Sequence, residues 1–130
     1  MDFIKHFLVA TLIFAAIDVT WIGYVANKIY KKYIGKLLLT KFLAGPAIIF
    51  YVIYIIGLVV FALQPALAEG SLWGAIWRGS LLGFVCYSTY DLTNLATLKG
   101  WSTRLTYIDL AWGTTLSCLV VTISYIIFSK

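Results

Sequence analysis

Long runs of apolar residues alternate along the chain with short polar segments. Four runs, at 3–26, 42–63, 72–98 and 103–128, each exceed the roughly 20 helical residues that cross a bilayer. Together they use nearly all of the sequence, so no separate soluble module is expected. The pattern predicts an all-α integral membrane protein, with one domain over residues 1–130 built as a bundle of four transmembrane helices.

Capping and breaking residues fall near the ends of these runs. Pro46 lies at the start of the second run, where the missing N–H of proline costs least. Gln64-Pro65 is expected to close the second run, and Ser71 to cap the third. These positions separate the predicted helices.

The segment between the first and second runs is rich in lysine. Aliphatic residues and tyrosines alternate with the lysines at roughly helical spacing. This pattern is typical of a short helix in the membrane interface whose lysines extend toward the headgroups. A plain connecting loop is the alternative. The lysines are Lys28, Lys31, Lys32, Lys36 and Lys41.

Composition and charge fit a membrane protein and predict its orientation. Hydrophobic residues make up 62% of the chain and charged residues 12%, against about 25% charged residues in soluble domains. Basic residues favour the cytoplasmic side, so we expect the lysine-rich segment and residues 99–104 inside and both termini outside. The net charge of +5 is then an orientation signal that also favours anionic membrane lipids. It does not indicate nucleic-acid binding.

Small residues recur at four-residue spacing in the last two runs. Gly79 and Gly83 form a GxxxG pair, and Gly113 and Ser117 repeat the spacing. Small side chains let two helix backbones approach closely, so these faces predict close helix contact within the bundle or between subunits. Because four helices barely enclose a pathway, we expect a homo-oligomer, a dimer.

Three aspartates, Asp18, Asp91 and Asp109, lie within the apolar runs and are three of the five acidic residues. A charged side chain at the centre of a membrane helix costs roughly 2.5–3.5 kcal/mol. Each must therefore be protonated, paired, bound to a cation or exposed to water. At about 1.5 Å per residue, they lie roughly 12, 10 and 9 Å from the cytoplasmic ends of their runs. This agreement predicts a shared acidic pocket in the cytoplasmic half.

Polar and aromatic residues flank the aspartates one helical turn away. A tyrosine and an asparagine could orient a ligand, and two tryptophans could wall off a polar pocket and donate their indole N–H. No lysine or arginine lies at this depth, so a proton, a hard cation or an organic ammonium would balance the charge. The candidate binding residues are Asp18, Asp91, Asp109, Asn94, Tyr87, Trp21 and Trp112.

Several short motifs are distinctive. They are Tyr-Asp-Leu-Thr-Asn at 90–94, Gly-Trp at 100–101, Asp-x-x-Trp at 18–21, Asp-x-x-Trp-Gly-Thr at 109–114 and Pro-Ala-Leu at 65–67. With these motifs the chain resembles, over essentially its full length, a bacterial membrane protein family known as domain of unknown function 2177. The resemblance implies a four-span protein of the bacterial inner membrane. It supplies no activity, substrate or cofactor.

The leading functional hypothesis is a small transporter or carrier subunit whose acidic pocket binds a proton, a cation or a cationic solute. An intramembrane enzyme acting on a lipid or isoprenoid is an alternative, because paired carboxylates can serve as general acid and base. No nucleophile motif accompanies them. A structural or accessory subunit is the third hypothesis, in which each aspartate only hydrogen-bonds across helices. The residues identify no substrate, metal or cofactor.

Overall fold

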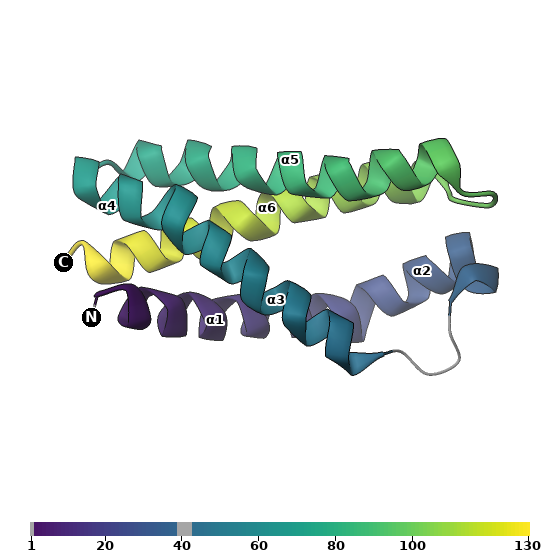
Figure 1. Cartoon of the computed structure of the whole chain (residues 1–130), viewed down its shortest axis with the longest axis horizontal. Coiled ribbons are helices and arrows are strands. Elements are labelled where there is room, and N and C mark those ends of the chain that lie inside the picture. The colour runs from purple at the N-terminus through teal and green to yellow at the C-terminus, as the bar shows by residue number, and fades with distance from the viewer. Residues whose placement is uncertain (1, 39–42) are drawn as a thin grey trace.

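The computed structural model describes residues 2–38 and 43–130, and every regular element within them is a helix. The chain forms four long helical rods that run back and forth along one direction (Figure 1). The two ends of the chain lie together at one end of the bundle (Figure 1). The predicted all-α fold is confirmed.

The first rod is one continuous helix. It consists of α1 (Asp2–Trp21), the π-helical segment η1 (Ile22–Ala26), α2 (Asn27–Ile34) and the short 3-10 turn η2 (Gly35–Leu37). The lysine-rich segment is thus helical but extends the first helix, and Lys41 lies outside the described residues. The rod has 36 residues and is about 54 Å long. It therefore exceeds the roughly 30 Å hydrocarbon core of a bilayer and must tilt or extend beyond it.

The second rod also continues further than the sequence predicts. It contains α3 (Ala44–Leu58), the π-helical η3 (Val59–Leu63) and α4 (Gln64–Glu69). The sequence predicts an end at Gln64-Pro65, whereas the helix passes through Pro65. This proline is the second residue of α4, one residue after the π-helical segment, and a proline is best tolerated in the first turn of a helix.

Among the described residues, three helices are long and apolar enough to cross a membrane: Asp2–Leu37, Ala44–Glu69 and Thr103–Phe128. The last of these is α6. The remaining rod, α5 (Leu72–Thr97), matches α6 in length, with 26 residues, but is less apolar. The count of four spans and the membrane sides of the termini stay predictions.

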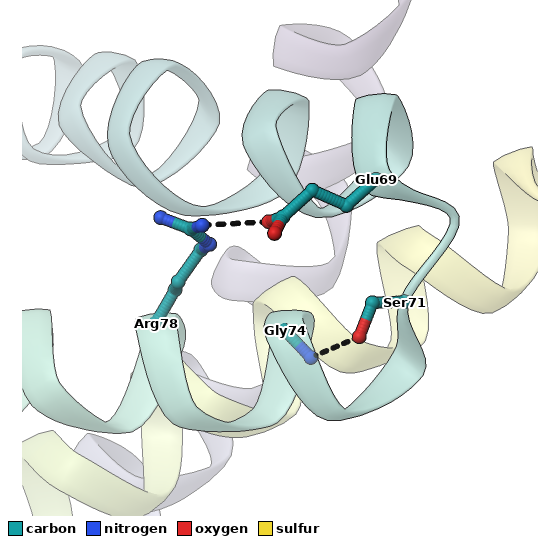
Figure 2. A network of polar contacts seen from close by, with 4 residues as sticks. All are labelled: Glu69, Ser71, Gly74 and Arg78. Carbon is teal, nitrogen blue, oxygen red and sulfur yellow. Dashed lines mark hydrogen bonds and ion pairs between the residues drawn. The ribbon is translucent and has the colours of Figure 1, made fainter.

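A compact turn connects α4 to α5 (Figure 2). Gly70 adopts the left-handed conformation, with a φ of 64°, which only glycine reaches without strain. The Ser71 hydroxyl accepts a hydrogen bond of 2.8 Å from the Gly74 N–H and caps α5, as predicted. Arg78 closes the turn by an ion pair of 2.6 Å with Glu69. These contacts fix the antiparallel arrangement of the second and third rods.

The helices α5 and α6 make the most extensive contact of the fold. A Cβ atom on Gly79 would meet the Ser117 carbonyl at 2.9 Å, and one on Gly83 would collide with the Gly113 carbonyl. The predicted close contact of small residues is confirmed, and it lies within one chain. Because these faces are used inside the bundle, a dimer would have to form through other surfaces.

The hydrophobic core lies toward the end of the bundle that carries the termini. Phe14 of α1, Leu58 and Leu63 of the second rod, and Leu116 and Val120 of α6 are buried there. Many large apolar side chains on the outer surface are exposed, as contact with lipid tails requires. The buried aspartates lie beyond this core, toward α2.

Candidate functional site

The three aspartates of the apolar runs are all buried. Asp18 on α1 is 8% exposed, Asp91 on α5 is 0% exposed and Asp109 on α6 is 1% exposed. A buried carboxyl group is tolerated only where hydrogen bonds, a proton or a cation compensate for lost water. The three residues meet this requirement in different ways.

Asp18 is held by two neutral donors from two other helices. The Tyr51 hydroxyl on α3 donates to Oδ2 at 3.0 Å, and the Trp112 indole N–H on α6 donates to Oδ1 at 3.4 Å. The Trp21 ring stacks on Trp112, with ring centroids 4.2 Å apart and planes 9° apart. The carboxyl group thus lies in an aromatic environment.

Asp91 and Asp109 form a pair between α5 and α6. Their carboxyl groups lie within hydrogen-bonding reach of each other. The Tyr30 hydroxyl on α2 lies 2.6 Å and 2.7 Å from the two Asp109 oxygens. Both oxygens of Asp91 are buried and have no donor among the described residues. The pair therefore has one protein donor for two carboxyl groups.

A cavity of about 1070 Å³ lies between the first rod and α3, which diverge toward the end of the bundle that carries the α5–α6 turn (Figure 1). Asp18 lines one part of it, and Lys31 lines another. Lys31 is thirteen residues further along the same helix, or roughly 20 Å away, and makes no ion pair with Asp18 among the described residues. The aromatic residues that line the cavity are Trp21, Tyr30, Phe50, Tyr51, Tyr87 and Trp112.

The structure brings together some of the predicted residues and leaves others apart. Asp18, Trp21, Tyr87 and Trp112 line the cavity. Tyr87 fits because α6 has no side chain at Gly113, where a Cβ would collide with the tyrosine ring.

Asp91, Asp109 and Asn94 do not line the cavity. Asp109 precedes Trp112 by one turn of α6, so the aspartate pair is adjacent to the cavity without opening into it. Asn94 is half-buried, and its side chain lies at Tyr90. The three aspartates thus share a level of the bundle but form two sites rather than one pocket. Within residues 2–38 and 43–130, no group of three or more His, Cys, Asp or Glu side chains could hold a metal ion.

Three residues of these sites are not among those predicted from the sequence: Tyr30, Tyr51 and Lys31. A signal existed for Tyr51, because a hydroxyl in the middle of an apolar run needs a partner. Nothing in the local sequence distinguishes Tyr30 from Tyr33 in the lysine-rich segment. Lys31 is missed because hydropathy ends the first helix before it, whereas the backbone continues.

The comparisons with known proteins agree with the architecture. A family model described as "Predicted membrane protein (DUF2177)" matches residues 3–126. The chain belongs to this family. The DUF2177 match extends over all four rods and both aspartate sites, so the resemblance indicated by the short motifs is confirmed, and the chain is a membrane protein. The function of DUF2177 proteins is unknown. No curated protein and no solved structure matches the chain.

Proposed function

We propose that this protein is a small carrier of the bacterial inner membrane that binds a lipophilic organic cation at Asp18. The observation that supports this proposal is the buried Asp18 carboxyl group in an aromatic cavity of about 1070 Å³. Its two donors, Tyr51 and Trp112, are neutral, and no basic group forms an ion pair with it among the described residues. An ionised Asp18 therefore keeps its full negative charge.

The walls of the cavity favour an organic cation over a hydrated metal ion. The faces of aromatic rings attract cations by about 0.5–2 kcal/mol each, and tryptophan does so most strongly. Two tryptophans and two tyrosines surround Asp18. An organic cation gains both this attraction and the burial of its apolar groups, whereas a small metal ion would have to exchange its water shell for few oxygen ligands.

The size and the charges of the cavity fit a bulky cation. Ligand pockets typically measure about 300–1,000 Å³, so a cavity of about 1070 Å³ accommodates a bulky molecule. Lys31 repels a cation from its part of the cavity, and Asp18 attracts one roughly 20 Å away. The two charges thus favour binding of a cation at the Asp18 end of the cavity.

The two alternative functions have less support. The enzyme hypothesis rests on paired carboxylates as general acid and base, but Asp18 is the one carboxyl group among the cavity-lining residues that the structure describes. A purely structural role would account for the Tyr51 and Trp112 hydrogen bonds to Asp18. It would not account for the cavity beside them.

Binding of tetraphenylphosphonium to the protein in lipid nanodiscs tests the proposal. We expect saturable quenching of tryptophan fluorescence, because Trp21 and Trp112 lie beside Asp18. Asp18→Asn should weaken binding at least about tenfold, which corresponds to about 1.4 kcal/mol. Asp2→Asn, on the same rod but exposed, is the matched control and should leave binding unchanged. Equal affinity of Asp18→Asn, or equal binding of the neutral triphenylphosphine oxide, would contradict the proposal.

Uptake into proteoliposomes tests carriage separately from binding. The wild-type protein should accelerate entry of radiolabelled tetraphenylphosphonium, and Asp18→Asn should remove the acceleration while Asp2→Asn retains it. Saturable binding without accelerated uptake would show that the protein binds the cation and does not carry it.

A further inference from the structure

The Asp91 carboxyl group lacks a hydrogen-bond donor in the part of the chain that the structure describes. It is fully buried, and neither of its oxygens has a donor among the described residues. The polar group that it faces is the carboxyl group of Asp109, within hydrogen-bonding reach. Two ionised carboxylates are both acceptors and form no hydrogen bond, whereas one shared proton supplies a donor. The unpartnered oxygens therefore point to a ligand between the two side chains.

The helices that carry the pair cannot separate to relieve repulsion. Gly79 and Gly83 of α5 lie against the backbone of α6 at Ser117 and Gly113. This contact, two to three turns from Asp91, holds the two helix axes at a fixed and short distance. The charge of two adjacent carboxylates must therefore be reduced by a bound species rather than by movement.

No positive side chain serves that purpose among the described residues. The titratable groups near the pair are Tyr30 on α2, Tyr87 and Tyr90 on α5, and Asp18 on α1, and none of them is cationic. Lys31 follows Tyr30 but lines the cavity and forms no ion pair with either carboxyl group. A calcium ion would take about six to eight oxygen ligands, more than two carboxyl groups and one hydroxyl provide.

We propose that Asp91 and Asp109 form a proton-binding site that holds one proton between their carboxyl groups and is capped by the Tyr30 hydroxyl. This site is separate from the cation site at Asp18, and its existence does not depend on it. Tyr30 also lines the cavity, so this residue lies between the proton-binding site and the cavity. A change in the proton content of the pair would alter the bond that holds α2 against α6.

The small number of acidic residues allows a direct spectroscopic test. The chain has five, and two of them, Asp2 and Glu69, are exposed. In an Asp18→Asn variant, the pair is therefore the remaining source of a buried protonated carboxyl group. We expect the infrared spectrum of this variant in lipid bilayers at neutral pH to show the carbonyl stretch of a single protonated carboxyl group. Absence of the band, or its removal by sodium or lithium ions, would overturn the proposal.

Two substitutions of Asp91 then test the role of the proton. Asp91→Asn places an amide N–H where the proton lies and can donate to Asp109. Combined with Asp18→Asn, it should abolish the band without lowering the melting temperature. Asp91→Leu has similar volume but no donor, so it should melt at a lower temperature than Asp91→Asn. Persistence of the band in the Asn variant, or equal melting temperatures of the two variants, would overturn the proposal.

If Asp91→Asn does not fold, Tyr30→Phe provides a second variant. It keeps both carboxyl groups and removes only the capping hydroxyl. Combined with Asp18→Asn, it should retain the band at a shifted frequency, because Asp109 loses its donor. An unshifted band would show that Tyr30 does not cap the pair, and a missing band would show that no proton is held there.

Discussion

At the scale of single residues, the Tyr51 hydroxyl is the closer of the two donors to Asp18. Its oxygen lies 3.0 Å from the carboxylate, against 3.4 Å for the Trp112 nitrogen. The Tyr51 ring also packs edge-to-face on Phe14, with centroids 5.5 Å apart. A phenylalanine would keep this packing, so the contribution of the hydroxyl can be measured alone.

Tyr51→Phe should lower the free energy of unfolding by about 1–3 kcal/mol, because a buried acceptor loses its donor. Chemical unfolding in mixed micelles would measure the change. Tyr107→Phe is the matched control, since this side chain is 68% exposed, and it should change stability by less than about 0.5 kcal/mol. Equal effects of the two substitutions would show that Asp18 does not depend on Tyr51.

The depth of the aspartates and the donor role of Trp112 were predictable from the sequence, but the tyrosine partners Tyr51 and Tyr30 were not. Counting residues from the helix ends places Asp18, Asp91 and Asp109 at one level, and the structure holds them in adjacent sites at that level. Tyr51 reaches Asp18 because of the direction in which α3 crosses α1. Crossing directions depend on the packing of whole helix surfaces, and local spacing does not encode them.

At the scale of the helices, the close contact between α5 and α6 depends on glycines, which have no side chain. Gly83 lies where any Cβ would collide with the Gly113 carbonyl. Gly57, at the end of α3 and in the middle of the second rod, has as its nearest neighbour the flexible Phe61 ring, 3.9 Å from where a Cβ would lie. The two glycines therefore differ in their packing and not in their helical conformation.

Gly83→Ala should lower the unfolding free energy by about 1–3 kcal/mol or more, because the helices must move apart or distort. Gly57→Ala should be neutral or stabilise the protein by up to about 1 kcal/mol, since alanine favours helix. Thermal unfolding of both variants in the same detergent provides the comparison. If Gly83→Ala were as stable as Gly57→Ala, the close contact described for α5 and α6 would be wrong.

The sequence predicted helices more reliably than their ends. The boundaries of α5 and α6 agree with the predicted runs at 72–98 and 103–128 to within one residue. The first two rods differ because hydropathy changes at Ala26 and at Gln64, whereas the hydrogen-bonded backbone continues. A helix ends where its backbone hydrogen bonds end, and a change of polarity marks only where it leaves an apolar environment.

At the scale of the whole molecule, the arrangement of the rods makes the orientation testable. The chain termini and the α4–α5 turn lie at one end, and η2 and the α5–α6 turn lie at the other (Figure 1). The described lysines of the lysine-rich segment and Lys99 lie near the end that carries η2 and the α5–α6 turn. The positive-inside rule therefore assigns this end to the cytoplasm.

A cysteine at position 36, Lys36→Cys, should react with a membrane-impermeant maleimide only when the cytoplasmic face is accessible. Ser129→Cys should react only from the opposite face. Both substitutions require a background in which Cys86 and Cys118 are replaced by serine. Reaction of the position-36 cysteine only from the outer face would show that the protein has the opposite orientation. The cavity would then lie in the outer half of the membrane.

The π-helical segment η1 acts as a one-residue insertion in the first rod. It changes the direction in which every later side chain of that rod points around the helix axis. In a regular α-helix, the twelve residues from Asp18 to Tyr30 would leave the two side chains about 120° apart around the axis. Absorbing one extra residue removes about 100° of that angle and turns Tyr30 to nearly the same side as Asp18. Both side chains accordingly contact α6. Loss of one residue within Ile22–Ala26 would therefore allow a regular α-helix that still points Tyr30 toward Asp109, whereas a regular α-helix through all twelve residues would turn Tyr30 away.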